Sequence, residues 1–426
     1  MTLSAPDAHL VTDQAPNGLT LTATSLDTVP LLQARLALRL PLGTPADLAA
    51  SDVVAACWSL HSATARLEQA GGIASVNRRR DWLLLGLQAT ADLQPLLADT
   101  LAELVHAGFT TATVERAVTL VTQQATVAAS QPAVHATRRM WSAYYGQLPP
   151  AVDPAPDPEL TGHATLSDVT EAFARFVTPH RAHLALVGAT DTTQALTRFT
   201  AALSDWQAGL PDDRPALPTP LPSPGITTSH RPGQELTQIR LVAPAPPRND
   251  IMDFAAHQVA ATVLGGSFAS RINTVLREQH GLAYRCRAAT DYVDADVVVI
   301  EADVHTRHAP RAMSLLMELT DEYSTTGPDE EELRAAGGFI TGAYTINAGS
   351  QSGRASLLTA AVTQDLPPSA LTDVPRAIAA LTLADVRGAA AHYRPDRFSG
   401  VVCGDATGFP DQWRRRPGHP ASSSEG

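Results

Sequence analysis

The stretch Leu264–Tyr284 reads LGGSFASRINTVLREQHGLAY and carries signals for a turn, a helix, a helix end and a strand in close succession. After the paired glycines, apolar residues recur at helical spacing, at Ile272, Val275 and Leu276. This pattern predicts a short amphipathic helix that buries these three side chains. Gly281 is typical of a residue that ends a helix in the left-handed conformation. The stretch therefore predicts a short helix with a defined end.

Beyond Gly281, residues 282–287 predict an extended strand whose side chains alternate between two faces. Arg277 lies near the end of the predicted helix, and Tyr284 lies at the start of the strand. Because the chain reverses between them, we expect their side chains to approach one another. On residue types alone, such an arginine is usually a surface ion-pair partner and such a tyrosine a half-buried packing residue.

The stretch resembles the signature of the second domain in the pitrilysin family of zinc peptidases, which includes insulinase and mitochondrial processing peptidase. The family pattern is close to LGGGxSSRLxxxLREKxGLAY. The resemblance implies that Arg277 and Tyr284 reach from the second domain towards substrate bound at a zinc ion in the first, where they bind peptide and stabilise the transition state. The other matched positions, which support this pair, are Gly265, Gly266, Ser270, Arg271 and Gly281.

Composition limits the class of protein. The chain has 426 residues, which allows two or three domains, and a formal net charge of -12. No basic stripe accompanies aromatic residues, so we expect no nucleic-acid partner. The first residues lack a basic head followed by an apolar run, and no stretch reaches the length of a membrane span. With three isolated cysteines, the sequence predicts a cytoplasmic protein without a membrane partner.

An internal repeat predicts the architecture. Residues 166–191, LSDVTEAFARFVTPHRAHLALVGATD, and residues 383–405, LADVRGAAAHYRPDRFSGVVCGD, share a helix start and then a Pro-x-Arg sequence before a strand that ends in glycine. At a similar offset, residues 67–75 (LEQAGGIAS) correspond to residues 277–284 (REQHGLAY). The chain is therefore interpreted as a tandem duplication.

Each half alternates predicted strands, such as 82–90 and 297–304, with predicted helices, such as 94–107 and 250–264. This alternation favours an α+β fold in which each half is an antiparallel sheet covered by helices. The family resemblance implies that the two halves face each other across a cavity. We expect a first half at residues 1–210, a proline-rich linker at 211–232, a second half at 233–409 and a disordered tail at 410–426.

The first half lacks the zinc ligands of the family. Active members carry HxxEH, in which two histidines on one helix face bind zinc and the glutamate takes a proton from the bound water. The corresponding helix, Asp47–Ser59, contains no histidine. The helix expected to supply a third, acidic ligand, Thr113–Pro132, has the neutral amides Gln123 and Gln124 near its middle. We therefore expect no metal or other cofactor in this chain, and zinc in a partner subunit.

Other histidines do not replace that motif. His180 with His183, and His305 with His308, stand three residues apart at predicted strands, where such positions point to opposite faces. His61 has no second histidine beside it in the sequence. We interpret these side chains as surface or turn residues.

Only the second copy of the repeat carries the polar pair, because Leu67 and Ser75 stand in the first copy where Arg277 and Tyr284 stand in the second. We therefore predict a non-catalytic, substrate-binding subunit of a heterodimeric zinc metallopeptidase, inactive alone, whose partner brings HxxEH and whose ligand is a peptide. The alternatives are a purely structural subunit, like the core subunits of the respiratory cytochrome complex, and a stand-alone peptide-binding clamp. A peptidase with an unrecognised site is the least favoured.

Overall fold

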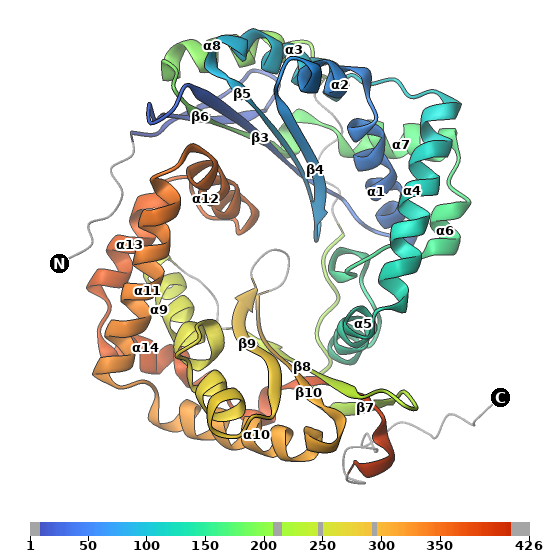
Figure 1. Cartoon of the computed structure of the whole chain (residues 1–426). Coiled ribbons are helices and arrows are strands. Elements are labelled where there is room, and N and C mark those ends of the chain that lie inside the picture. Colours follow the sequence, from blue (N-terminus) through green and yellow to red (C-terminus); the bar gives the residue numbers. More distant parts are fainter. Residues whose placement is uncertain (1–8, 208–214, 246–249, 292–295, 410–426) are drawn as a thin grey trace.

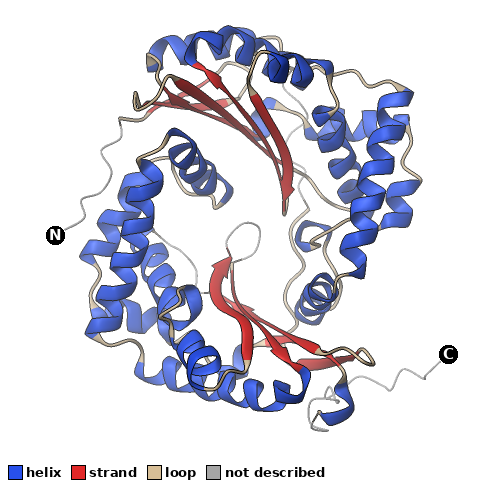
Figure 2. Cartoon of the chain, in the orientation of Figure 1, coloured by secondary structure: helices blue, strands red, loops and turns tan. Residues whose placement is uncertain are grey.

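The computed structural model describes residues 9–207, 215–245, 250–291 and 296–409 (Figure 1). The tail that we expected to be disordered, 410–426, lies outside these residues. The strands form two mixed sheets, each with helices against it (Figure 2). Among the described helices, none has both the length and the apolar composition that a membrane crossing requires.

The two sheets repeat one strand order. The first contains, in spatial order, β1 (Val11–Gln14), β2 (Thr20–Ser25), β6 (Ala182–Gly188), β3 (Leu31–Arg39), β5 (Trp82–Thr90) and β4 (Ile73–Arg79). The second contains β7 (Ile226–His230), β11 (Ser399–Gly404), β8 (Leu236–Pro244), β10 (Val297–His305) and β9 (Ala283–Asp291). Apart from the extra edge strand β1, each strand of one sheet has a counterpart in the other. The strand β7 lies inside the stretch 211–232 that we expected to be linker.

The expectation of purely antiparallel sheets is wrong for one strand pair in each sheet. The pairs β2–β6 and β7–β11 run parallel, whereas the remaining neighbours are antiparallel. Parallel neighbours need a long connection, and in both cases most of the repeat lies between the paired strands. Strand periodicity alone does not reveal such a pairing.

Helices surround the two sheets, and most of them lie on the outer side of the sheet in their own part of the chain (Figure 1). In the first part of the chain they are α1 (Pro45–Ser59), α2 (Ser62–Gln69), α3 (Gln94–Val105), α4 (Thr111–Ser130), α5 (Pro132–Tyr145), α6 (Pro158–Gly162), α7 (Leu166–Phe176) and α8 (Thr192–Ala202). In the second part they are α9 (Ile251–Ala261), α10 (Ala309–Thr326), α11 (Glu330–Ala348), α12 (Gln351–Thr363), α13 (Ala370–Ala380) and α14 (Leu383–Ala390). The largest apolar clusters lie between these layers and the sheets.

The repeat seen in the sequence has the same local structure in both copies. Helices α7 and α14 each begin with a capping box, formed by Thr165 with Asp168 and by Thr382 with Asp385. Each helix is followed by a short 3-10 turn that contains the Pro-x-Arg sequence and then by a buried strand, β6 or β11. The shared helix start, turn and strand are therefore one structural unit that occurs twice.

Two helices cross over between the sheets. Helix α5 packs on β8 and β11 of the second sheet, where Trp141 and Tyr145 join a cluster with Val242 and Val401. Helix α12 packs on β3 and β6 of the first sheet, and Leu358 contributes to a cluster on that face. In Figure 1, α12 lies against the first sheet and α5 beside the second. Each sheet is thus covered partly by a helix from the other part of the chain.

Candidate functional site

The stretch Leu264–Tyr284 folds as a helix end, a loop, a second short helix and the start of β9. Two of the three apolar residues expected in the core, Ile272 and Leu276, are fully buried, and Val275 packs at the core's edge. Both helical pieces, 262–266 and 273–279, are π-helical turns. Such turns are rare and occur often at functional sites.

The glycines of this stretch have distinct roles. A Cβ atom on Gly265 would lie 2.3 Å from the backbone nitrogen of Ala288 in β9, so only glycine allows the helix and the strand to approach this closely. Gly281 has a φ of 60°, which confirms the left-handed helix end. At Gly266 an added Cβ would meet the Thr262 side chain at 3.1 Å, which is a milder restriction.

Asn273 ties the loop, the short helix and β9 together. Its side-chain amide donates to the Ser267 carbonyl at 2.9 Å and to the hydroxyl of buried Ser270 at 3.0 Å. The Cys286 thiol of β9 donates to the side-chain oxygen Oδ1 of Asn273 at 3.3 Å. Burial raises the pKa of that thiol to about 11, so Cys286 stays protonated and acts as a donor rather than as a nucleophile.

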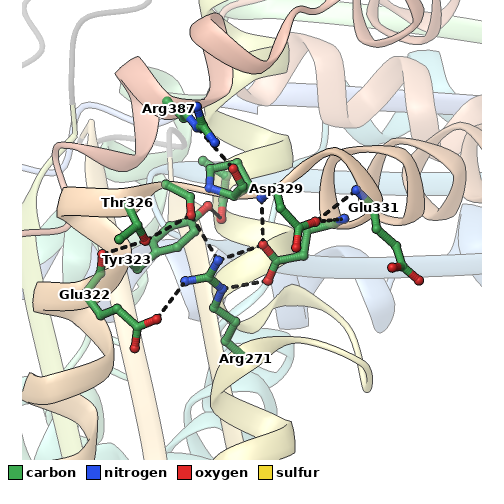
Figure 3. Close-up of polar contacts among 11 residues, drawn as sticks. Arg271, Glu322, Tyr323, Thr326, Asp329, Glu331 and Arg387 are labelled. Atoms are coloured by element: carbon green, nitrogen blue, oxygen red, sulfur yellow. Dashed lines mark hydrogen bonds and ion pairs between the residues drawn. The ribbon is translucent and has the colours of Figure 1, made fainter.

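Arg271 joins the short helix to the start of α11 (Figure 3). Its guanidinium donates to both Glu332 oxygens, at 2.6 and 2.7 Å, and to the Gly327 carbonyl at 2.9 Å. It also lies over the Tyr323 ring, 5.0 Å from the ring centroid. The hydrogen bonds that Arg271 donates to Glu332 raise the pKa of Arg271. Arg271 therefore stabilises the fold, because its guanidinium donates its hydrogen bonds to other residues of the chain.

Arg277 and Tyr284 line one open pocket of about 550 Å³, which we call the Arg–Tyr pocket. The Arg277 guanidinium lies 5.3 Å from the centroid of the Phe268 ring. Three aromatic side chains around it are largely exposed, Tyr284 at 83%, Phe268 at 78% and Phe339 at 55%. Neither Arg277 nor Tyr284 makes a side-chain hydrogen bond or ion pair within the described part of the chain. Their donors are thus available to a ligand.

The wall of the Arg–Tyr pocket formed by β9 is positively charged. Arg285 and Arg287 line it and both donate to the same Glu301 oxygen, at 3.3 and 2.8 Å. Burial opposes ionisation of Glu301, but the hydrogen bond from Arg287 and the neighbouring guanidinium charges lower its pKa overall. One carboxylate thus faces two arginines, and Arg277 adds a third cation. This field favours a ligand group that carries or develops negative charge.

In the described part of the first sheet, no open pocket lies at the position equivalent to the Arg–Tyr pocket, because apolar side chains fill it. Leu67, the counterpart of Arg277, is fully buried in the core. A Cβ atom on the following Gly72 would meet the Leu67 side chain at 2.5 Å. An apolar contact therefore fills the position that is polar and open beside β9.

The helices that would carry zinc ligands do pack against each other, but their residues do not fit a zinc ion. The helices expected at Asp47–Ser59 and Thr113–Pro132 are α1 and α4, which are neighbours. The buried stripe of α4 is apolar, and Gln123 and Gln124 are exposed. Across the described ranges, no three or more His, Cys, Asp or Glu side chains are grouped to hold a metal.

The histidines singled out in the sequence have local partners. His61 caps α2 by accepting from the Ala63 backbone at 3.2 Å. The His183 ring contacts the Thr22 hydroxyl at 3.0 Å, and burial lowers the pKa of His183 to about 4. His305 and His308 lie 5.9 Å apart, ring to ring. His180 lies in the 3-10 turn Pro179–Arg181.

Sequence reasoning missed the aromatic walls of the Arg–Tyr pocket. Phe268 follows the paired glycines in a predicted loop, where we do not expect a large apolar residue to reach the core. Its position in the sequence could therefore have indicated an exposed aromatic side chain at the site. Phe339 lies on α11, more than fifty residues away in sequence, and no local pattern connects it to Arg277.

Comparisons with known proteins agree with this description. The sequence profile described as peptidase M16 inactive domain matches residues 163–336, a range that includes the whole of Leu264–Tyr284. No curated protein sequence matches the chain.

Solved structures share the fold over nearly the full chain. One is a peptidase M16 inactive domain from Pseudomonas fluorescens, with a TM-score of 0.82, 19% identity and coverage of 93% of this chain and 98% of that one. A protease from Helicobacter pylori has a TM-score of 0.80, 14% identity and coverage of 93% and 99%. A chain of complex III2 from Candida albicans has a TM-score of 0.77, 13% identity and coverage of 95% and 98%. Residues 163–336 therefore match the M16, or pitrilysin, inactive-domain family, and nearly the full chain shares the fold of a solved M16 inactive domain.

Proposed function

We propose that this chain is the non-catalytic, substrate-binding subunit of a two-chain M16-type zinc peptidase. The observation that carries the proposal is the pair Arg277 and Tyr284, which line one open, positively charged pocket and keep their donors unused by the described residues. If the pair served only the fold, we would expect its donors to form hydrogen bonds within the chain, as those of Arg271 do.

In this proposal a peptide binds as an added strand at a sheet edge of the partner subunit, fixed by main-chain hydrogen bonds. Arg277 and Tyr284 donate to the carbonyl oxygen of the peptide bond that is cleaved. As negative charge develops on that oxygen, the hydrogen bonds strengthen, which stabilises the transition state. The Phe268 ring beneath the Arg277 guanidinium restricts its orientation before substrate arrives.

The zinc ion and the glutamate that activates water belong to the partner in this scheme. The donor set of α1 and α4 supports that division, because α1 has no histidine and its carboxylates Asp47 and Asp52 pair with arginines of the fold. The middle of α4 offers neutral amides where the metal would need a carboxylate. This chain would supply substrate binding and charge stabilisation only.

A second candidate is a purely structural subunit, favoured by the similarity to a chain of complex III2. Such a subunit needs an assembly surface but does not need Arg277 and Tyr284 in particular. The two readings differ in one respect, because only the peptidase subunit loses function when these two side chains are shortened.

The test is co-expression with an HxxEH-bearing chain encoded by a neighbouring reading frame. We expect a one-to-one complex that holds one zinc ion and cleaves peptides, whereas this chain alone binds no zinc stoichiometrically and cleaves nothing. Stoichiometric zinc in the isolated chain, or a stable complex whose activity is the same as that of the partner alone, would contradict the proposal.

A further inference from the structure

A second polar cavity, of about 240 Å³, lies between the first sheet and α12. Strands β3, β4 and β5 form its floor and α12 its roof. On the floor, the Arg35 side chain crosses β5 at Gly86, where an added Cβ atom would lie 3.1 Å from Arg35 Nη1 and 3.2 Å from its Cδ. Because Gly86 has no side chain, the Arg35 guanidinium can lie against β5 at this position.

Among the described residues Arg35 has no carboxylate partner, whereas Arg39 on the same strand has two. Arg39 pairs with Asp81 at 3.1 Å and with Asp365 at 2.7 Å. Within the part of the chain that the structure describes, the Arg35 side chain makes two long hydrogen bonds, at 3.3 Å each, to the Gln33 side chain and to Ser352 on α12. Its Nε is buried and finds no hydrogen-bond partner in the described ranges. Burial lowers the pKa of Arg35, because it removes the charged guanidinium from water.

The remaining lining is rich in groups that complement an anion. Ser75, Asn77 and Arg79 project from alternate positions of β4, and Ser356 and Thr359 from α12. No residue of the lining is acidic. Arg79 is exposed and forms no ion pair with any described carboxylate. Two cationic side chains and several hydroxyl and amide groups thus converge on one space.

We propose that the cavity between β3, β4, β5 and α12 binds a carboxylate group of a peptide. A carboxylate accepts two parallel hydrogen bonds from a guanidinium. The cavity is below the range of about 300–1,000 Å³ that is usual for drug-sized ligands and suits a single residue.

The neighbouring strand favours a peptide as the carrier of the carboxylate. β4 is an edge strand of the first sheet, so one row of its backbone groups has no strand partner in the described fold. A peptide that pairs with this row would pass the face that carries Ser75, Asn77 and Arg79 and meet α12. The inference rests on the proposed function only in taking the ligand to be a peptide.

The roof of the cavity is held in place before any ligand binds. At the start of α12, Gln351 donates to the carbonyls of Leu26 and Val29 at 2.6 and 2.7 Å. Beyond its end, Asp365 pairs with Arg39. Because both ends are fixed to the first sheet, binding needs little ordering of the walls, which favours affinity.

The experiment measures peptide binding to the full chain alone by isothermal titration calorimetry at low salt. Three N-acetylated tetrapeptides serve as probes: tetra-alanine with a free carboxyl end, tetra-alanine with an amidated end, and an amidated peptide with one internal glutamate. Inorganic phosphate is a fourth probe. We expect a carboxylate-bearing peptide to bind about tenfold or more tightly than amidated tetra-alanine. Binding of the free acid alone assigns a peptide end, and binding of the glutamate peptide an acidic side chain.

Variants separate this site from general charge effects. Arg35→Gln should remove the difference between the carboxylate and amide peptides. Arg116→Gln, a matched loss of one exposed charge on α4, should leave it within about twofold. In Ser352→Asp the new carboxylate lies beside Arg35 and should weaken peptide binding about tenfold without removing any cavity side chain.

The inference is overturned if no carboxylate peptide binds better than its amide, if Arg35→Gln and Ser352→Asp both bind as the parent does, or if only phosphate binds. Because the measurement needs no partner chain, it is independent of cleavage. Failure of binding together with restored cleavage in the mixture would remove this inference alone. Binding without cleavage would remove only the proposed function.

Discussion

Replacing Tyr284 by phenylalanine removes one hydroxyl group and tests the proposed function most directly. The Tyr284 side chain is 83% exposed, and its hydroxyl has no hydrogen-bond partner among the described residues, so the change in unfolding free energy should stay within about 0.5 kcal/mol. The ring remains as a wall of the Arg–Tyr pocket. A stable chain with a nearly unaltered pocket is therefore expected.

The expected kinetic effect is much larger than the effect on stability. A preorganised donor to a developing oxyanion contributes on the order of 3 kcal/mol, which corresponds to about a hundredfold in rate. Since the charge exists mainly in the transition state, the loss should fall on kcat, with KM little changed.

The assay is hydrolysis of a fluorogenic peptide by the mixture with the HxxEH-bearing partner, with size-exclusion chromatography to confirm that the complex still forms. Tyr344→Phe is the control, because it removes a hydroxyl on α11 that lies outside the pocket and forms a hydrogen bond with the Gln258 side chain. Full activity of Tyr284→Phe in an intact complex would refute the proposed role. Equal losses in both variants would refute it as well.

Four further predictions concern the scaffold and are checked by denaturant unfolding. Gly265→Ala should destabilise the chain by about 1–3 kcal/mol, because the added Cβ would lie 2.3 Å from the Ala288 nitrogen. Gly388→Ala, with open space around the new Cβ in α14, should instead stabilise it by about 0.5–1 kcal/mol. Arg271→Gln should cost about 1–2 kcal/mol by removing the fork to its carboxylate partner on α11, and an unchanged midpoint would show that this contact is dispensable. His183 is neutral in the fold because burial lowers its pKa to about 4, whereas the unfolded chain takes up a proton near 6.5. The unfolding free energy should therefore fall as pH decreases from about 6.5 towards 4, and His183→Gln should flatten that part of the profile.

The parts of the fold that depend on local interactions were predictable from the sequence. The burial of Ile272 and Leu276 follows from helical spacing, and the left-handed Gly281 follows from the need to end the helix. The same holds for the unit shared by α7 and α14, which begins in both copies with a threonine cap.

The parts that depend on distant segments were not predictable. Strands β2 and β6 pair in parallel although most of one repeat separates them, and the short edge strand β1 has no counterpart to reveal it. Strand β3 begins at Leu31, although the polar Gln33 and Arg35 interrupt the apolar pattern at its start. Gln33 and Arg35 face α12, which arrives from more than three hundred residues away. The residues next to Gln33 and Arg35 in the sequence therefore do not indicate that these side chains are covered.

The crossing of α5 and α12 has a consequence for how the protein comes to be folded. In a fragment that ends before residue 215, the aromatic side of α5 would be exposed to water because the second sheet is missing. In the complementary fragment, the apolar face of α12 would be exposed because the first sheet is missing. Either piece alone should aggregate, whereas the two made together should assemble into a clipped but native particle. We therefore expect the first part of the chain to reach its native packing only after α12 has been synthesised, because α12 covers one face of its sheet.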